Sequence, residues 1–402
     1  MDKTEEPAQA GLTAAIIAGC LVAFLGFGFS ATFGVFLQPM SADLGWGREV
    51  FSLSIALQAL SWGLTQPLAG IVADRYGTAR VLAFGAIIGA TGYFLRGFVT
   101  DPTLFALTGI VTGIGTGACS FPIVIVALGK IVTPAQRSFV LGLGTAAASL
   151  GMFVAAPASS LMISAWGWKT SIFVIAASFL FILPGLIFIS RVSKPTAGNQ
   201  SAGAFGTAIT TAFRDRSYLC LFFGFFVCGF HVAFIGTHLP AYVVDKELPL
   251  VVGAWSLALI GLFNIAGSFL SGWSGNVVLK KSVLSGIYFT RAIVIALFIL
   301  APISPMGVYI FSAAMGLLWL STVPPTMGLV AQTQGLTFLS TLAGLVFFSH
   351  QTGSFLGAWL GGRIFDLTGD YTLMWWAAVG LGVLAALIHM PIREPALKAT
   401  NT

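Results

Sequence analysis

The sequence predicts an all-α integral membrane protein with twelve transmembrane helices, and three observations support this prediction. Of its 402 residues, 57% are hydrophobic and only 8% are charged, against roughly 25% charged in an ordinary soluble domain. The apolar residues form repeated runs long enough for a helix to cross the ~30 Å hydrocarbon layer, which takes about 20 residues. The basic residues lie mainly in the short segments between those runs. Because backbone groups in lipid must be satisfied within each helix, the runs indicate a helical bundle, whereas a β-barrel would show short alternating segments.

The apolar runs fall into two sets of six. The first set occupies residues 12–38, 50–73, 80–100, 103–130, 137–161 and 170–190. The second set occupies residues 217–242, 250–274, 282–302, 306–331, 338–362 and 372–391. Residues 191–216 between them are polar and contain Pro195 and Gly198, which is typical of a linker. We therefore expect a six-helix N-terminal bundle over residues 1–190, a cytoplasmic linker, and a six-helix C-terminal bundle over residues 217–402.

The distribution of lysine and arginine predicts which loops face the cytoplasm. With both termini inside, thirteen basic residues fall in inside segments and four in outside loops. This asymmetry follows the positive-inside rule. We therefore expect both termini in the cytoplasm. We also expect a monomer in the plasma membrane, which in a bacterium is the inner membrane. The net charge of +6 does not indicate nucleic-acid binding, because the basic residues are scattered along the chain.

We expect no cofactor, no metal and no enzymatic activity. Cys20, Cys119, Cys220 and Cys228 lie inside apolar runs without the spacing of metal ligands or of a disulfide framework. The glycines at residues 113–117 are not followed by the Gly-Lys-Ser/Thr of a nucleotide loop. No nucleophile, base and orienting group form a plausible catalytic constellation.

The two halves of the chain repeat each other at an offset of 202 residues. The matched pairs are Gly70 with Gly272, Pro122 with Pro324, Gly151 with Gly353, and Phe153 with Phe355, while Asp74 falls on Asn276. These matches lie on equivalent spans of the two halves. Two parallel six-helix repeats are typical of transporters, whose binding site lies between the repeats near the bilayer midplane.

The segment between the second and third spans resembles the signature loop of the major facilitator superfamily. It reads Gly70, three residues, Asp74-Arg75, one residue, Gly77, and then a basic residue at Arg80. Together with the twelve spans, the central linker and the half-repeat, the resemblance covers essentially the whole chain. It implies a secondary transporter that works by alternating access, with this loop as a conformational latch. The alternative is that the loop only fixes the topology.

Each latch residue has an expected physical role. Gly70 would let two helices approach closely, as small residues do in membranes. Asp74 would accept hydrogen bonds from a neighbouring helix end, and Arg75 and Arg80 would lie at the cytoplasmic interface. The second copy of the loop has Asn276 in place of the acid, so we expect a weaker latch there.

Within the superfamily, the chain is most similar to the branch of monocarboxylate and oxalate:formate transporters and its bacterial relatives. The glycine-rich first span and residues 349–362 of the eleventh span carry this similarity. Two expected arginines are missing. Gly109 occupies the place of the arginine that often precedes Gly-x-Gly in the fourth span, and Gly267 occupies the place of the branch's substrate arginine in the eighth. Neither role can be transferred to these positions.

The acidic residues indicate which substrates are disfavoured. All thirteen lie in loops, in tails or at the ends of spans. A cavity that selects organic cations would normally present a buried carboxylate, because the cation loses its hydration there. Export of cationic drugs is therefore disfavoured.

Ionisable residues deep in the spans are instead cationic or able to become so. His231 and His350 lie near mid-depth of the seventh and eleventh spans, so both could flank one ligand. Arg291 is placed deep in the ninth span, where it would contact either a substrate anion or helix carbonyls. His238 lies nearer the outside, and Arg96 is close enough to the outer end of the third span to reach the interface. Intramembrane ionisable residues suggest function, and these favour an anionic substrate.

Uncharged polar residues complete the predicted site. Amide and hydroxyl groups bind oxygen-rich metabolites, although they also form interhelical links of ~0.6 kcal/mol each. The selected residues are Gln58, Ser120, Asn264, Thr322 and Gln351. Pro122, and Pro324 with Pro325, interrupt the fourth span of each half, where a packing kink is the simpler interpretation and a binding site the other.

The sequence thus predicts a secondary transporter of a small organic anion, specifically a monocarboxylate, coupled to proton symport or to anion exchange. The alternative is an exporter of neutral amphipathic compounds, for which 35 phenylalanines and few charges would also suffice. A receptor or an intramembrane enzyme is a third class, which the half-repeat and the latch loop disfavour.

Overall fold

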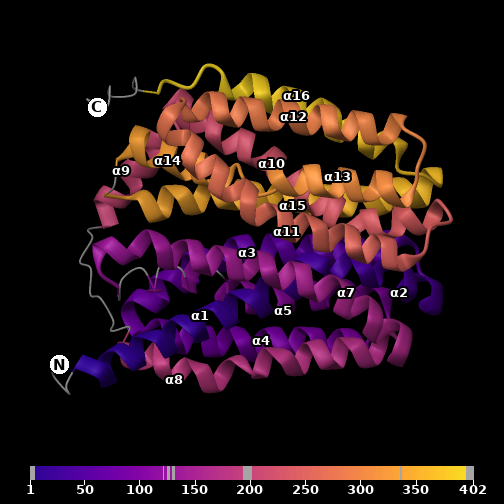
Figure 1. The fold of residues 1–402 in the computed structure, drawn as a ribbon, viewed down its shortest axis with the longest axis horizontal. Helices are drawn as coiled ribbons and strands as arrows, with labels where there is room; N and C mark the ends of the chain where they lie inside the picture. Colours follow the sequence, from indigo (N-terminus) through magenta and orange to yellow (C-terminus); the bar gives the residue numbers. More distant parts are fainter. Residues whose placement is uncertain are drawn as a thin grey trace. The chain divides into compact units, whose positions relative to one another are not determined.

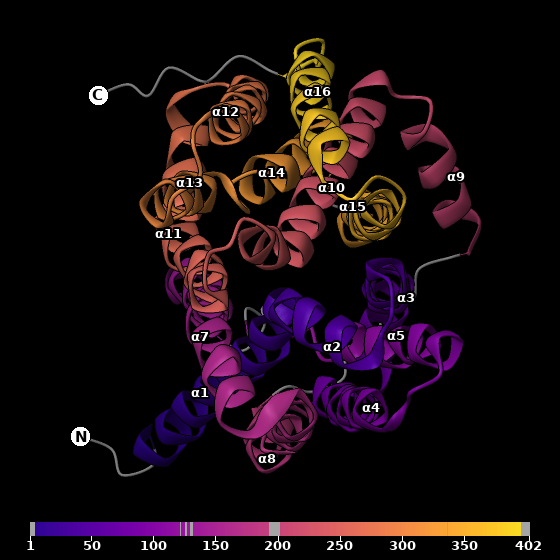
Figure 2. The ribbon, with the colours of Figure 1, turned by 90° about the vertical axis from the view of Figure 1, so that its right-hand side faces the viewer.

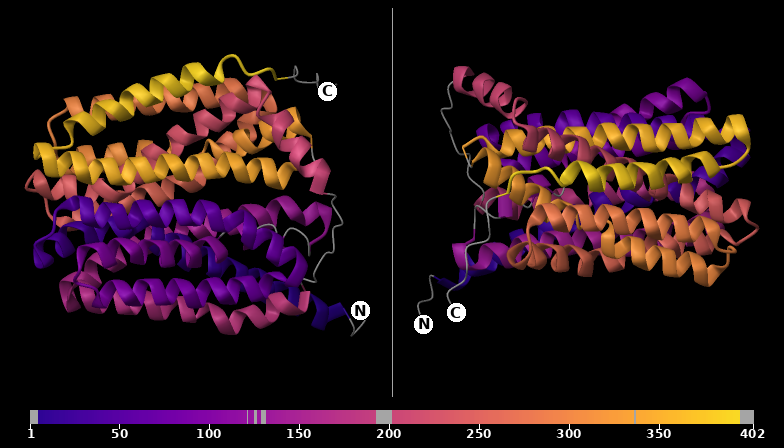
Figure 3. Two further views of the ribbon diagram at one scale, coloured as in Figure 1. Left: turned by 180° about the vertical axis from the view of Figure 1, so that it is seen from behind. Right: turned by 90° about the horizontal axis from the view of Figure 1, so that it is seen from above.

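A computed structural model describes residues 5–120, 122–124, 127–128, 132–192, 202–335 and 337–394. Over this part of the chain the regular elements are all helices (Figure 1). The chain divides into two compact units, Met1–Gly198 and Asn199–Thr402. Within each unit the long helices lie side by side, as the further views also show (Figure 3).

Unit 1, residues 1–198, is built on the first six apolar runs. Its helices are α1 (Glu5–Thr32), the 3-10 helix η1 (Phe33–Phe36), α2 (Leu37–Leu44), α3 (Arg48–Tyr76), α4 (Thr78–Phe98), α5 (Pro102–Ala118), α7 (Pro134–Leu180) and α8 (Ile182–Val192). Helix α7 contains a break at Gly167, whose φ of 77° lies in the left-handed region that favours glycine.

Unit 2, residues 199–402, repeats this plan. Its helices are α9 (Ala202–Ala212), α10 (Arg216–Asp245), α11 (Leu250–Val277), α12 (Lys280–Leu300), α13 (Pro305–Leu318), α14 (Val323–Gln334), α15 (Leu339–Thr368) and α16 (Thr372–His389). Helix α14 contacts α10, α11, α12 and α15, and the end-on view shows it among them (Figure 2). The predicted linker contains helix α9, which the proline and glycine content did not indicate, while residues 193–201 lie outside the described part.

The helices account for the twelve predicted crossings. In the described residues, ten helical segments are long and apolar enough to span a membrane. One of them, Gly142–Arg191, has 50 residues and holds two crossings because of the break at Gly167. Helix α15 is 30 residues long and adds the twelfth, with more polar side chains along its length. The predicted all-α membrane fold is therefore confirmed.

Capping residues fix where the two fourth spans begin. The Asp101 carboxylate accepts from the backbone N–H of Leu104 at 2.8 Å, and Pro102 starts α5. In unit 2 the Ser304 hydroxyl accepts from the N–H of Gly307 at 3.1 Å, and Pro305 starts α13. Side-chain acceptors satisfy N–H groups that a helix leaves open, and proline at the first position lacks one.

Glycines allow close packing between pairs of helices. A Cβ at Gly109 of α5 would collide with the carbonyl oxygen of Ser54 in α3. A Cβ at Gly353 of α15 would likewise collide with the carbonyl oxygen of Phe226 in α10. The backbone contact explains why Gly109 stands where the superfamily often has an arginine, since no side chain fits there.

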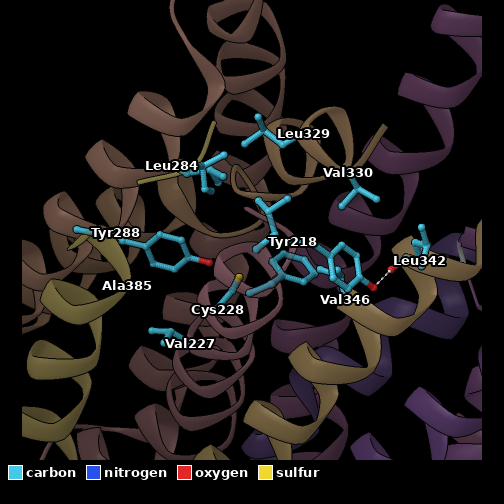
Figure 4. Close-up of a cluster of buried hydrophobic side chains, with 14 of the residues drawn as sticks. Tyr218, Val227, Cys228, Leu284, Tyr288, Leu329, Val330, Leu342, Val346 and Ala385 are labelled. Carbon is cyan, nitrogen blue, oxygen red and sulfur yellow. Dashed lines mark hydrogen bonds between the residues drawn. The ribbon is translucent and has the colours of Figure 1, made fainter. Parts of the chain in front are cut away.

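A cluster of buried side chains forms part of the interior of unit 2 (Figure 4). The Tyr218 hydroxyl donates to the carbonyl oxygen of Leu342 at 2.9 Å and ties α10 to α15. Figure 4 also shows the Tyr288 hydroxyl of α12 turned toward the sulfur of Cys228 in α10. Cys228 belongs both to this cluster and to the polar site described next.

Candidate functional site

The fourth span of unit 2 is broken in the middle. Helix α13 ends at Leu318 and α14 begins at Val323, so residues 319–322 leave the helical hydrogen-bond ladder. Pro324 and Pro325 follow at the start of α14 and cannot donate to it. The sequence favoured a simple kink at these prolines, whereas the structure has a discontinuity. Freed backbone groups at membrane depth need partners within the protein.

Arg291 supplies partners for the carbonyls of this break. It is fully buried on α12, and its Nε donates to the carbonyl oxygen of Leu318 at 3.1 Å. Its Nη2 donates to the carbonyl oxygens of Leu318 and Trp319. Its Nη1 donates to Cys228 Sγ at 3.6 Å. Bonding to helix carbonyls was one of the two roles expected for Arg291, and contact with a substrate stays a prediction.

Two further predicted residues lie at the same break. The Asn264 side-chain oxygen of α11 accepts from the backbone N–H of Leu320 at 2.9 Å. The Thr322 hydroxyl lies 3.2 Å from Cys228 Sγ. Arg291, Asn264 and Thr322 are therefore brought together from three separate elements. Cys228 was not among the predicted site residues, although its position three residues before His231 places both on one face of α10.

His350 and Gln351 form a pair on α15 beside this break. His350 Nδ1 lies 3.0 Å from Gln351 Oε1, and its ring stacks on Phe347 with centroids 5.6 Å apart. His350 also lies close enough to Cys228 to interact with the thiol. The pair is thus continuous with the cluster at the broken helix.

His231 faces a different neighbour. Its Nε2 lies 2.8 Å from the carbonyl oxygen of Ala378 in α16, and its Nδ1 has no hydrogen-bond partner among the described residues. No described contact joins its ring to His350. The expectation that the two histidines flank one ligand stays a prediction. His238 contacts Tyr371 and the carbonyl oxygen of Ala358.

The predicted residues of unit 1 lie on α3 and at a second broken span. Gln58 donates from Nε2 to the Ser30 hydroxyl at 2.7 Å. Helix α5 ends at Ala118, and Ser120 just beyond it is buried with no hydrogen-bond partner for its hydroxyl among the described residues. At the offset of 202, Ser120 corresponds to Thr322. Both units therefore interrupt their fourth span at an equivalent point.

The latch loop joins α3 to α4 through Gly77. Gly77 has φ 95°, which a residue with a side chain rarely adopts. Asp74 and Arg75 at the end of α3 and Arg80 at the start of α4 are exposed. A Cβ at Gly70 would meet no described atom within 4 Å, and the close helix approach expected there stays a prediction. The role of these latch residues in gating stays a prediction.

At the equivalent loop of unit 2, an acidic residue near the C-terminus binds the start of α12. Glu394 is buried, and its two carboxylate oxygens accept from the backbone N–H groups of Lys280 and Lys281, each at 3.0 Å. The Lys280 ammonium lies 3.7 Å from the same carboxylate. A carboxylate at a helix N-terminus is stabilised by the helix dipole. The sequence analysis missed this contact, and the side chain of Asn276 lies outside the described residues.

Arg96 corrects another expectation. It was expected to reach the membrane interface, but it is fully buried in unit 1. Its Nη2 donates to the Ser54 hydroxyl at 3.0 Å and its Nε to the Thr108 hydroxyl at 3.4 Å. The helix depth alone did not reveal that the side chain points toward α3 and α5 rather than outward.

The fold and its broken spans define an integral membrane protein with the architecture of a secondary transporter. The family model of the Major Facilitator Superfamily matches residues 19–358. The chain therefore belongs to this superfamily, whose members transport small molecules across membranes and are not enzymes.

Relatives at low identity are similar over nearly the whole chain. The chain is 24% identical over 374 residues to "Uncharacterized MFS-type transporter YcxA" of Bacillus subtilis (strain 168), covering 90% of both chains. It is 24% identical over 382 residues to "Monocarboxylate transporter 13" of Bos taurus, covering 91% of this chain and 86% of the relative. It is 26% identical over 398 residues to "Hexuronate transporter" of Bacillus subtilis (strain 168), covering 88% of both.

Proposed function

We propose that the protein transports a small organic anion, a monocarboxylate, by alternating access between two six-helix bundles over residues 1–190 and 217–402. The observation that carries this proposal is the charge inventory of the membrane-spanning helices. Arg96, Arg291, His231 and His350 are buried. Acidic residues in the described helices lie only within the first or last four residues. An anion is the solute whose charge this interior compensates.

The named relatives support the same substrate class. Monocarboxylate and hexuronate both denote carboxylic acids, and relatives with each name cover most of this chain. The size of the carbon portion is not fixed by the charge inventory. The short-chain class is preferred because the glycine-rich first span and residues 349–362 are most similar to the monocarboxylate branch.

The predicted residues divide into two proposed roles. Around the broken fourth spans, Arg291, Asn264, Thr322 and Ser120 shape the site, because freed backbone groups and polar side chains meet there. The other group offers hydrogen bonds or a switchable charge to the substrate and consists of Gln58, His231, His350 and Gln351.

The cycle is proposed to run without a cofactor, in a plasma-membrane monomer with cytoplasmic termini. Proton symport is the favoured coupling mode, because a histidine can take up a proton together with the anion. Anion exchange is the second mode. Gly70, Asp74, Arg75 and Arg80 are proposed as the latch that closes the cytoplasmic side.

Uptake into proteoliposomes tests the proposal. A panel of radiolabelled short carboxylates is offered under an inward proton gradient, with and without a protonophore. We expect saturable, protonophore-sensitive uptake that His350→Ala lowers. His389→Ala is the matched control, because it removes a buried histidine of the same unit whose Nδ1 bonds to Ala385 of its own helix. Export of neutral amphipathic compounds without carboxylate uptake would favour the second candidate function.

A further inference from the structure

The buried guanidinium of Arg96 has a positive charge that no described acid compensates. Its contacts are two hydroxyls, of Ser54 and Thr108, and two aromatic rings, of Phe33 and Tyr93. Arg96 lies in the last turn of α4 and is fully buried, and a buried charge is costly unless it is paired or reached by water. Cation–π contacts offset only part of this cost. The positive charge of Arg96 is therefore one that a bound anion would compensate.

Two buried donors of neighbouring side chains on α4 are unpaired. Arg96 Nη1 and the Tyr93 hydroxyl are buried and have no hydrogen-bond partner among the described residues. The two residues are three apart on α4, so they share a face of the helix, and the Arg96 Cζ lies 5.4 Å from the Tyr93 ring centroid. A carboxylate has two oxygens and can accept one bond from each donor.

The protein also holds the guanidinium in one orientation. Nη2 and Nε are fixed by Ser54 on α3 and by Thr108 on α5, and the Thr108 hydroxyl itself donates to the carbonyl oxygen of Phe105 at 2.6 Å. The Phe33 ring lies 4.8 Å from Cζ. Nε and Nη2 thus have hydrogen-bond partners, and Nη1 is the nitrogen without one among the described residues. Preorganised donors bind an anion without a further ordering cost.

Polar side chains extend from this group toward a less buried residue of unit 1. The Tyr93 hydroxyl lies near Ser30 and Gln58. Gln58 bonds to Ser30 at 2.7 Å, and its Oε1 has no partner among the described residues. Ser30 on α1 is only partly buried. Rotation of the Gln58 amide would turn its NH₂ group toward an anion while Ser30 donates to its oxygen, because amide ends are interchangeable in such a network.

We propose that Arg96, Tyr93 and Gln58 bind the carboxylate group of the transported anion within unit 1. This inference rests on the proposed function and deepens it by assigning the charge partner to α4 rather than to α12. Arg291 differs from Arg96 because its guanidinium already bonds to two backbone carbonyls and to Cys228.

Binding is tested through ligand-dependent thermal stability of the purified full-length protein. Sodium acetate, lactate and pyruvate are titrated against wild type, Tyr93→Phe and Arg96→Gln, with sodium chloride and lactamide as comparison solutes. We expect a saturable rise in Tm with at least one carboxylate. Losing one bond to the charged group should weaken binding about tenfold or more in Tyr93→Phe. The ligand-free Tm of this variant should change little, because the hydroxyl has no hydrogen bond of normal geometry among the described residues.

Ser159→Ala is the matched control, since it removes another buried unit 1 hydroxyl without a described partner, and it should keep the full shift. If Arg96→Gln does not fold, Tyr93→Phe decides alone. Carboxylate binding equal to wild type in Tyr93→Phe would overturn the inference, as would a shift with chloride and none with any carboxylate.

Transport by the same preparations separates the two failures. Carboxylate uptake that is normal in a Tyr93→Phe variant with wild-type binding leaves the proposed function standing and removes this site. Absence of both binding and uptake in active wild-type vesicles removes the proposed function itself.

Discussion

Replacing Arg291 by methionine should destabilise unit 2, because the guanidinium satisfies the two carbonyls freed where α13 ends. Methionine fills similar volume but has no donor for the oxygens of Leu318 and Trp319. A hydrogen bond to a charged group contributes about 1.5–3 kcal/mol. Bonds between membrane helices are often weaker, on the order of 0.6 kcal/mol. We therefore take the lower end for each of the two carbonyls, about 3 kcal/mol in all.

This loss corresponds to a measurable change in melting temperature. A unit of 150–250 residues loses roughly 2–4 °C per kcal/mol, so Arg291→Met should melt about 6–12 °C below wild type. Arg291→Lys keeps a charge but lacks the planar fork that reaches both carbonyls, and it should fall between the two. The assay is thermal unfolding of the purified proteins in one detergent, without substrate.

Transport measurements on the same variants distinguish the two roles of Arg291. If the guanidinium holds the broken helix, transport and Tm should fall together, and lysine should restore part of both. An Arg291→Met protein with the wild-type Tm and no carboxylate uptake would refute this reasoning. It would mean that the charge acts on the substrate and contributes little to the break.

The remaining predictions concern packing, the second loop and the latch. Gly109→Ala should cost about 1–3 kcal/mol by overpacking against the carbonyl of Ser54, whereas Gly70→Ala, with no described atom near its Cβ, should leave Tm unchanged; equal Tm values would contradict the packing. Glu394→Gln should lower stability by about 1 kcal/mol, because it weakens the cap on α12, and a thermal melt checks this. Asp74 is exposed, so the Asp74→Asn variant should fold normally. It should nevertheless transport more slowly, and normal uptake kinetics would argue against a latch.

The fold could be predicted from the sequence because helices that cross a membrane need long apolar runs with few charges, and such runs are visible in the composition. Twelve spans follow from run length and from the lack of charge, and each helix satisfies its own backbone. The interruptions at Pro122 and Pro324 were also visible. A kink was expected at these prolines rather than a break in the helix, because a break is stable only when another element satisfies the freed carbonyls. Here the partner is Arg291, 27 residues away along the chain, and no local pattern connects the two.

The direction of long side chains was the main limit on predicting the site. Arg96 was placed by its depth in α4, which is correct for the backbone, but depth does not say whether the side chain turns outward or into the bundle. Burial among Ser54, Thr108 and Phe33 is a tertiary property. The cap by Glu394 was missed for a related reason, because residues 113 and 114 positions apart meet there.

A comparison of one carboxylate with its own amide tests the central claim most directly. Lactate and lactamide have nearly the same shape and differ in charge, so uptake of both radiolabelled compounds into proteoliposomes isolates the role of the anion. We predict saturable uptake of lactate or a close short-chain carboxylate, and no uptake of the matching amide above empty vesicles. Uptake of the amide, or of neutral amphipathic compounds, by vesicles that ignore every carboxylate would contradict an organic-anion transporter.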